Sequence, residues 1–95
     1  MLLKKLFGIN SNKEFNVYPN PASSYINIEN THNLSPNQNK YVLTLRNLQG
    51  QEVLSENVEF TNTYKLDITN LTNGIYFLSL QNDKENYVSK VVIQK

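Results

Sequence analysis

Hydrophobic and polar residues alternate in short runs from Glu14 to the last residues of the chain. The run Tyr25–Glu29 shows the pattern most plainly, because Ile26 and Ile28 alternate with polar or amphipathic residues. A period of two is typical of strands with one buried face, and spacings of about 8 to 12 residues are typical of sandwiches and barrels. No stretch after residue 14 shows the period of a three-turn helix.

The alternating runs predict seven strands. They cover residues 15–18, 25–29, 41–46, 52–58, 63–68, 75–80 and 87–93. Seven antiparallel strands, each with one buried face, predict an all-β fold, an immunoglobulin-like antiparallel β-sandwich, with a closed barrel as the alternative. The predicted core consists of Ile26, Ile28, Leu43, Leu45, Val53, Leu66, Ile68, Tyr76, Leu78, Leu80, Val91 and Ile93.

Turn residues separate these runs. Pro19 and Pro21 follow the first run and lack the N–H that a central strand needs, so they predict the end of an edge strand. Gly50 follows Gln49 between the third and fourth runs and predicts a hairpin. Gly74 follows Asn73 before the sixth run, and this dipeptide is a strong short-range hairpin signal. Residues 31–39 predict a long exposed connection.

Length and charge narrow the class of protein. The 95 residues suit one domain with one core, which we place at 14–95 after an N-terminal linker or fragment remnant at 1–13. Nine Lys and Arg against eight Asp and Glu give a net charge of +1, without the basic excess of nucleic-acid-binding domains. No apolar run reaches the roughly 18 residues of a membrane span. Residues 1–12 also lack the features of a secretory signal peptide.

Candidate chemistry is sparse. The chain has no cysteine, so disulfides and thiolate metal sites are excluded, and its one histidine, His32, lies in the predicted loop. Gly8, Gly50 and Gly74 stand too far apart to form a phosphate-binding loop. We therefore predict no catalytic residue, no cofactor and no metal site, and no enzymatic activity.

Exposed tyrosines support an alternative function. Tyr25, Tyr41 and Tyr87 would form a sugar-stacking platform if they shared one exposed face, as in an accessory carbohydrate-binding or adhesin module. Cross-strand packing is the commoner role of tyrosine in sheets. A structural spacer is a third interpretation.

Four separated motifs occur in a fixed order. They are Val17-Tyr18-Pro19-Asn20-Pro21-Ala22, Leu48-Gln49-Gly50-Gln51-Glu52-Val53, Leu71-Thr72-Asn73-Gly74-Ile75-Tyr76-Phe77 and Lys90-Val91-Val92-Ile93-Gln94-Lys95. With these motifs the chain resembles, over about residues 14–95, the type A C-terminal sorting domain of the type IX (Por) secretion system. One such motif alone would be weak support, whereas four in order are specific.

The resemblance implies a non-catalytic secretion signal attached to an N-terminal cargo protein, as in Gram-negative bacteria of the Bacteroidetes. Such cargo crosses the periplasm and is passed through the outer-membrane type IX translocon. A sortase-like surface peptidase then typically removes the domain, and the cargo is attached to the cell surface or secreted. Because only about thirteen residues precede the domain here, we expect a fragment of a longer protein, with the junction near Ser11 to Lys13.

The resemblance also implies roles for individual residues. We expect mainly structural roles for Pro19, Asn20, Pro21, Gly50, Gly74 and Tyr76. We expect translocon recognition by Lys90, Val91, Val92, Ile93 and Lys95. The alternation of the last run places Lys90 on a half-apolar face with Val88 and Val92. A lysine that only prevents edge-to-edge aggregation is the alternative. Removal of Gln94 and Lys95 is expected to block export and to leave the melting temperature nearly unchanged.

Overall fold

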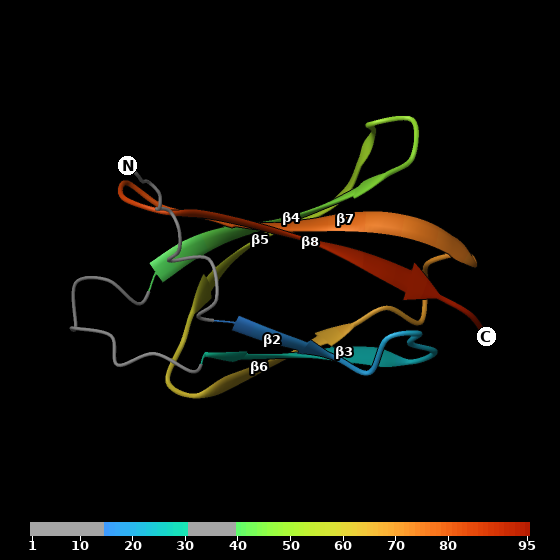
Figure 1. Cartoon of the computed structure of the whole chain (residues 1–95), viewed down its shortest axis with the longest axis horizontal. Helices are drawn as coiled ribbons and strands as arrows, with labels where there is room; N and C mark the ends of the chain where they lie inside the picture. The colour runs from blue at the N-terminus through green and yellow to red at the C-terminus, as the bar shows by residue number, and fades with distance from the viewer. Residues whose placement is uncertain (1–14, 31–39) are drawn as a thin grey trace, which may run out of the picture.

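The computed structural model describes residues 15–30 and 40–95, and these residues form seven β-strands and no helix. The strands are β2 (Phe15–Tyr18), β3 (Tyr25–Asn30), β4 (Lys40–Asn47), β5 (Glu52–Glu59), β6 (Thr63–Asp67), β7 (Gly74–Gln81) and β8 (Asn86–Ile93). They form a three-stranded sheet in the order β2-β3-β6 and a four-stranded sheet in the order β5-β4-β7-β8. All strand pairs are antiparallel, and the two sheets face each other (Figure 1). The predicted sandwich is confirmed.

The core lies between the two sheets. Every predicted core residue except Val53 is buried there. The core also includes side chains that the alternation alone did not identify, namely Phe15, Ala22, Tyr41, Val58 and Phe60. Because a two-layer domain of this size has one core, burial at these positions supplies most of the favourable folding free energy.

Val53 is exposed, and the prediction that it lies in the core was wrong. Leu45 pairs with Leu54, whereas the next residue of β4, Arg46, pairs with Glu52. Val53 is therefore the extra residue of a β-bulge, and it is 38% exposed. Leu54 packs against the core instead.

Of the two turns that contain Gly50 and Gly74, one joins paired strands of the same sheet and the other joins strands of different sheets. The hairpin between β4 and β5 is confirmed, with Gly50 at a φ of +87° and the Asn47 side chain accepting hydrogen bonds from Gln49 N and Gln51 N. The hairpin expected at Asn73-Gly74 was wrong. The segment between β6 and β7 passes from one sheet to the other, because β6 pairs with β3 and β7 pairs with β4 and β8.

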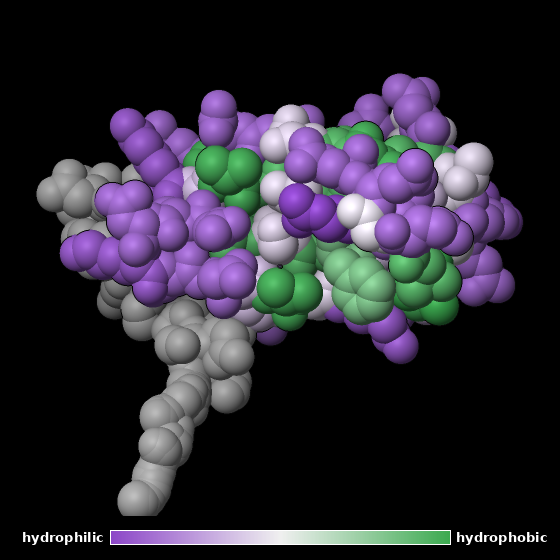
Figure 2. Space-filling view, turned by 90° about the horizontal axis from the view of Figure 1, so that it is seen from above, coloured by the Kyte–Doolittle hydropathy of each residue, from purple (hydrophilic) through white to green (hydrophobic). Residues whose placement is uncertain are grey.

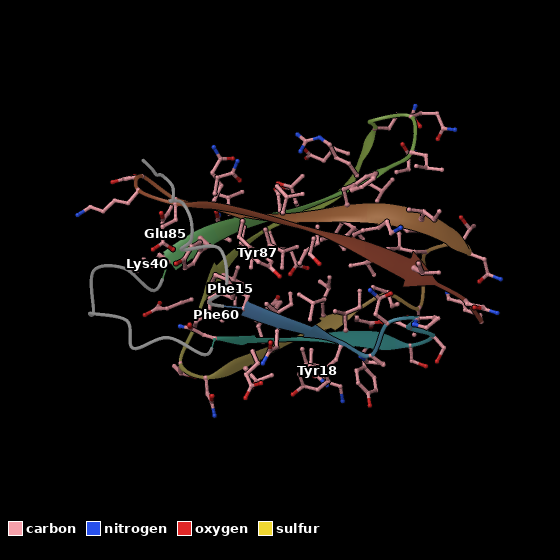
Figure 3. The ribbon with its side chains drawn as sticks, in the orientation of Figure 1. Phe15, Tyr18, Lys40, Phe60, Glu85 and Tyr87 are labelled. Atoms are coloured by element: carbon pink, nitrogen blue, oxygen red, sulfur yellow. The ribbon has the colours of Figure 1, made fainter. Side chains whose placement is uncertain are left out.

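An aromatic cluster fills one end of the sandwich. Its members are Phe15, Tyr41, Phe60, Tyr64 and Tyr87. Phe15 lies near its centre, with ring centroids 5.2 Å from both Phe60 and Tyr87. Figure 3 shows Phe15, Phe60 and Tyr87 at the end where the chain enters β2. The described residues include no helix long and apolar enough to span a membrane.

Candidate functional site

The segments that carry the four sequence motifs lie toward the opposite end of the sandwich from the aromatic cluster (Figure 1). These segments are residues 19–22, 48–51, 69–73 and 90–95, and we call this region the motif end. Most of these segments are loops, whereas residues 90–93 belong to β8. The motif end therefore joins distant parts of the chain around the last strand.

β8 is an edge strand, and residues 19–22 cover part of its free edge. The side-chain amide of Asn20 accepts a 2.9 Å hydrogen bond from Val92 N and donates a 3.1 Å hydrogen bond to Lys90 O. Ala22 forms a parallel bridge with Ile93, in which Ala22 N donates to Val92 O and Gln94 N donates to Ala22 O, each at 2.8 Å. We call residues 19–22 the strap.

The two faces of β8 differ. Val91 and Ile93 point into the core and are 0% and 1% exposed, respectively. On the outer face, Lys90 is exposed and Val92 is half-buried, and Val88 is 57% exposed. Alternation along the strand therefore divides the residues predicted to contact the translocon between the core and the surface.

Neighbouring side chains of β7 extend the outer face of β8. Ile75 pairs with Val92 and Phe77 pairs with Lys90, and both β7 side chains are partly exposed. Figure 2 looks onto this face of the four-stranded sheet and shows apolar surface grouped between polar regions. Lys90 is the only charged side chain that β7 and β8 place on this face between Val88 and Val92. The part of the outer face that β7 and β8 form beside residues 88–92 thus combines apolar contact area with one cation, Lys90.

Lys95 fixes the loop between β6 and β7. Its ammonium donates hydrogen bonds to Thr69 O, at 2.8 Å, and to Leu71 O, and its backbone N–H donates to the Asn73 side chain at 2.9 Å. Hydrogen bonds from the backbone and hydroxyl of Thr69 lower the pKa of Asp67, and the positive charge of Lys95 lowers it further. Lys95 therefore connects the end of β8 to the loop that follows β6 of the opposite sheet.

Tyr76 anchors the same loop from within the core. Its ring is buried, and its hydroxyl donates a 2.7 Å hydrogen bond to Thr72 O. The buried phenol is thereby satisfied, which a hydroxyl at the edge of a core requires. The Tyr76 bond thus holds the third sequence motif to itself, and the bond from Lys95 N to the Asn73 side chain joins this motif to the fourth.

A comparison with known protein families identifies the family of this chain. A model of the secretion system C-terminal sorting domain family matches residues 16–94, a range that includes residues of all seven strands. The chain belongs to this family. The resemblance to type IX sorting domains is thereby confirmed, while no curated protein matches the chain.

Pro19 and Pro21 of the sorting domain lie in the exposed part of the strap, after the edge strand β2. The peptide bonds that precede both prolines are cis. Gly74 has a φ of +156°, and a Cβ added there would lie 3.7 Å from the Tyr76 ring, an ordinary contact. The strap contacts of Asn20 were not apparent from the sequence, because its partners Lys90 and Val92 lie 70 and 72 residues away.

The three tyrosines proposed as a sugar platform do not share a face of the sorting domain. Tyr41 is buried in the aromatic cluster, and Tyr87 packs against the core with its hydroxyl 3.3 Å from Phe15 O. Tyr25 lies on the outer face of the other sheet, with Lys65 Nζ 4.4 Å from its ring centroid. The alternative of a sugar platform built from these three residues is therefore contradicted, and packing between strands, the commoner role, holds for Tyr41 and Tyr87.

The described surface also contains a groove of about 460 Å³, lined in part by Lys40, Val42, Asn57 and Asp83. Within residues 15–30 and 40–95, no three His, Asp or Glu side chains are placed to hold a metal ion. His32 lies outside the described residues. We take the motif end as the candidate site, because the segments that carry the four sequence motifs lie there.

Proposed function

We propose that this sorting domain directs an N-terminal cargo protein through the outer-membrane type IX translocon and performs no catalysis itself. The family match supports the sorting function. The observation that carries the proposal is the arrangement of β8, whose outer face is exposed while its inner face and its end are fixed by the core, the strap and the β6–β7 loop. A folded strand in a defined position is a suitable feature for recognition by a partner.

We propose different roles for the exposed, the buried and the strand-end members of the five recognition residues. Lys90 and Val92 offer side chains on the outer face for direct contact. Val91 and Ile93 act through the core, because their side chains are buried and hold β8 in register. Lys95 keeps the end of the strand in place through its bonds to the β6–β7 loop. Direct contact therefore centres on Lys90.

We place removal of the domain by a sortase-like peptidase before Phe15, near Ser11 to Lys13. Phe15 is 5% exposed, and its carbonyl accepts a hydrogen bond from Tyr87. A peptidase needs an accessible extended substrate, which a buried, hydrogen-bonded strand does not provide. The cargo would then be attached to the cell surface or released outside the cell. N-terminal sequencing of the released domain identifies the cleaved bond, and a new terminus after Phe15 would contradict this placement.

Export of a reporter tests the function. A periplasm-targeted fluorescent protein is fused in front of the full 95-residue chain and expressed in a bacterium with a type IX system. We expect the fusion at the cell surface or in the medium, and we expect it in the periplasm when the translocon gene is deleted. The same reporter without the chain controls for leakage. Equal export with and without the chain would refute the function.

A further inference from the structure

The free edge of β8 is divided into a covered part and an open part. In an antiparallel ladder, alternate residues direct both peptide groups away from the neighbouring strand. The strap hydrogen bonds show that Lys90, Val92 and Gln94 are the outward-directed residues at this edge. Val88 has the same parity, and within the described part of the chain no hydrogen bond covers its outward peptide group.

The strap satisfies the covered part as a short strand would. Between Lys90 O and Gln94 N, each outward backbone group has one partner in Asn20 or Ala22. Asn20 contributes its side-chain amide in place of a peptide group, since the amide also carries one donor and one acceptor. Within the chain itself, Asn20 and Ala22 therefore already pair with this edge of β8 much as a neighbouring strand would.

Little else holds the strap in place. Pro19, Asn20 and Pro21 are exposed, and only the small side chain of Ala22 is buried, at 1% exposure. The two prolines have no N–H, so the strap cannot extend the ladder along its own length. An ordinary extended strand would satisfy the same backbone groups and would add pairs at Val88, where the strap makes none.

We propose that the β8 edge is an acceptor site for an extended polypeptide strand of the secretion machinery, and that this strand begins pairing at Val88 and displaces the strap. The proposal rests on the proposed function and specifies how the same strand is recognised. The partner is defined by its chemistry: an edge or extended segment with free backbone N–H and C=O groups. Outer-face contacts at Lys90 then guide the incoming strand, because a lysine beside the edge lies next to the new pair.

A reversible lock on the strap provides the test. Because Ala22 and Ile93 pair in parallel register, Ser23 and Gln94 follow one step later, and both are exposed. We therefore expect the double variant Ser23→Cys/Gln94→Cys to join the residue after the strap to the residue after β8 through a disulfide in the oxidising periplasm. The control Asn16→Cys/Glu29→Cys joins β2 to β3, where these residues are paired and their side chains lie 3.3 Å apart.

Each variant is tested in the full-length chain as the reporter fusion, with disulfide formation checked by gel shift and folding checked by melting temperature. We expect the strap-locked fusion to remain in the periplasm, with export reduced at least about tenfold, while the β2–β3 lock is exported like the wild type. Equal export of the two locked proteins would overturn strand displacement. Failure of the wild-type fusion to be exported would instead refute the proposed function.

Weakening the strap gives a second, local readout. Asn20→Ala removes two of the strap hydrogen bonds, so we expect faster hydrogen exchange at Val92 N and little change at the central strand residue Leu43. This variant should still be exported, because the strap is displaced in any case. The exposed residue Asn57 provides the control substitution Asn57→Ala. Loss of export in Asn20→Ala with an unchanged melting temperature would show that the strap itself is recognised, and would overturn the proposal.

Discussion

The ring of Phe15 meets the ring of Tyr41 edge-on, with centroids 5.4 Å apart and planes at 90°. This contact joins the first strand of one sheet to a central strand of the other, at the end of the sandwich far from the motif end. The hydroxyl of Tyr41 donates a 2.7 Å hydrogen bond to Glu85, so the same residue also holds the turn before β8. The domain is thus closed at both ends by contacts between its sheets.

Truncation of Phe15 tests the importance of this closure. We expect Phe15→Ala to lower the free energy of unfolding by about 3 kcal/mol, because it removes a buried ring with three aromatic neighbours. Tyr18 on the same strand is 43% exposed, and Tyr18→Ala is expected to change stability by about 0.5 kcal/mol. Urea unfolding of both variants measures the difference. Similar losses in the two variants would show that the ring of Phe15 is not part of the core.

Lys95 also stabilises the fold. Loss of its ammonium in Lys95→Ala leaves Thr69 O and Leu71 O without this donor, and we expect a loss of about 1 kcal/mol, or about 4 to 8 °C in melting temperature. Lys84 in an exposed turn serves as the control, with Lys84→Ala expected to melt like the wild type. Because of these bonds we also expect a similar loss when Gln94 and Lys95 are removed, in place of the nearly unchanged melting temperature expected from the sequence. Identical melting temperatures of Lys95→Ala and Lys84→Ala would show that the Lys95 ammonium does not stabilise the fold.

Alkaline pH weakens a second contact at the aromatic cluster. The hydrogen bond from the Tyr64 hydroxyl to the Glu56 carboxylate raises the pKa of Tyr64 from 10.0 to about 12. A raised folded-state pKa gives stability that is complete below the unfolded-state pKa and is lost as pH rises through the folded-state pKa. Tyr64→Phe should therefore be less stable than the wild type at neutral pH, and the gap should narrow between pH 10.0 and about 12. Urea unfolding midpoints of both proteins across this pH range measure the difference in stability. A difference that stays constant with pH would show that ionisation of Tyr64 is not coupled to folding.

The bulge in β5 predicts that two adjacent apolar residues, Val53 and Leu54, contribute differently to stability. We expect Leu54→Ala to destabilise the domain by about 1 to 2 kcal/mol, because Leu54 packs against the core, and Val53→Ala to cost about 0.5 kcal/mol or less. Thermal unfolding of the two variants compares them directly. A larger loss for Val53→Ala would place Val53 inside the core and contradict the pairing of Leu45 with Leu54.

Sequence alternation predicted the strands well where local pattern determines the buried face. β3 and β7 follow this rule, since Ile26 and Leu78 lie in runs whose parity is unbroken. The burial of Val53 was mispredicted because a bulge changes parity, and a bulge depends on the partner strand. Phe60 lies just beyond a strand, where its burial depends on contacts with Phe15 and Tyr41.

In the candidate site too, the features that depend on local pattern could be predicted and those that depend on distant contacts could not. The outward position of Lys90 followed from alternation, because it depends only on neighbours in the same strand. The strap did not follow from any local pattern. Asn20 and Ala22 reach β8 from the opposite sheet, so their role as partners of Val92 depends on how the two sheets pack. Pro19 and Pro21 indicated the end of β2 and carried no information about this second contact.

Export of matched valine variants tests the central role of β8 most directly. Val88 and Val53 are exposed valines on the two edge strands of the same sheet, at 57% and 38% exposure. In the full-length reporter fusion, we expect Val88→Asp to reduce export at least about tenfold and Val53→Asp to be exported like the wild type, with similar melting temperatures. Equal export of the two variants would contradict recognition at β8.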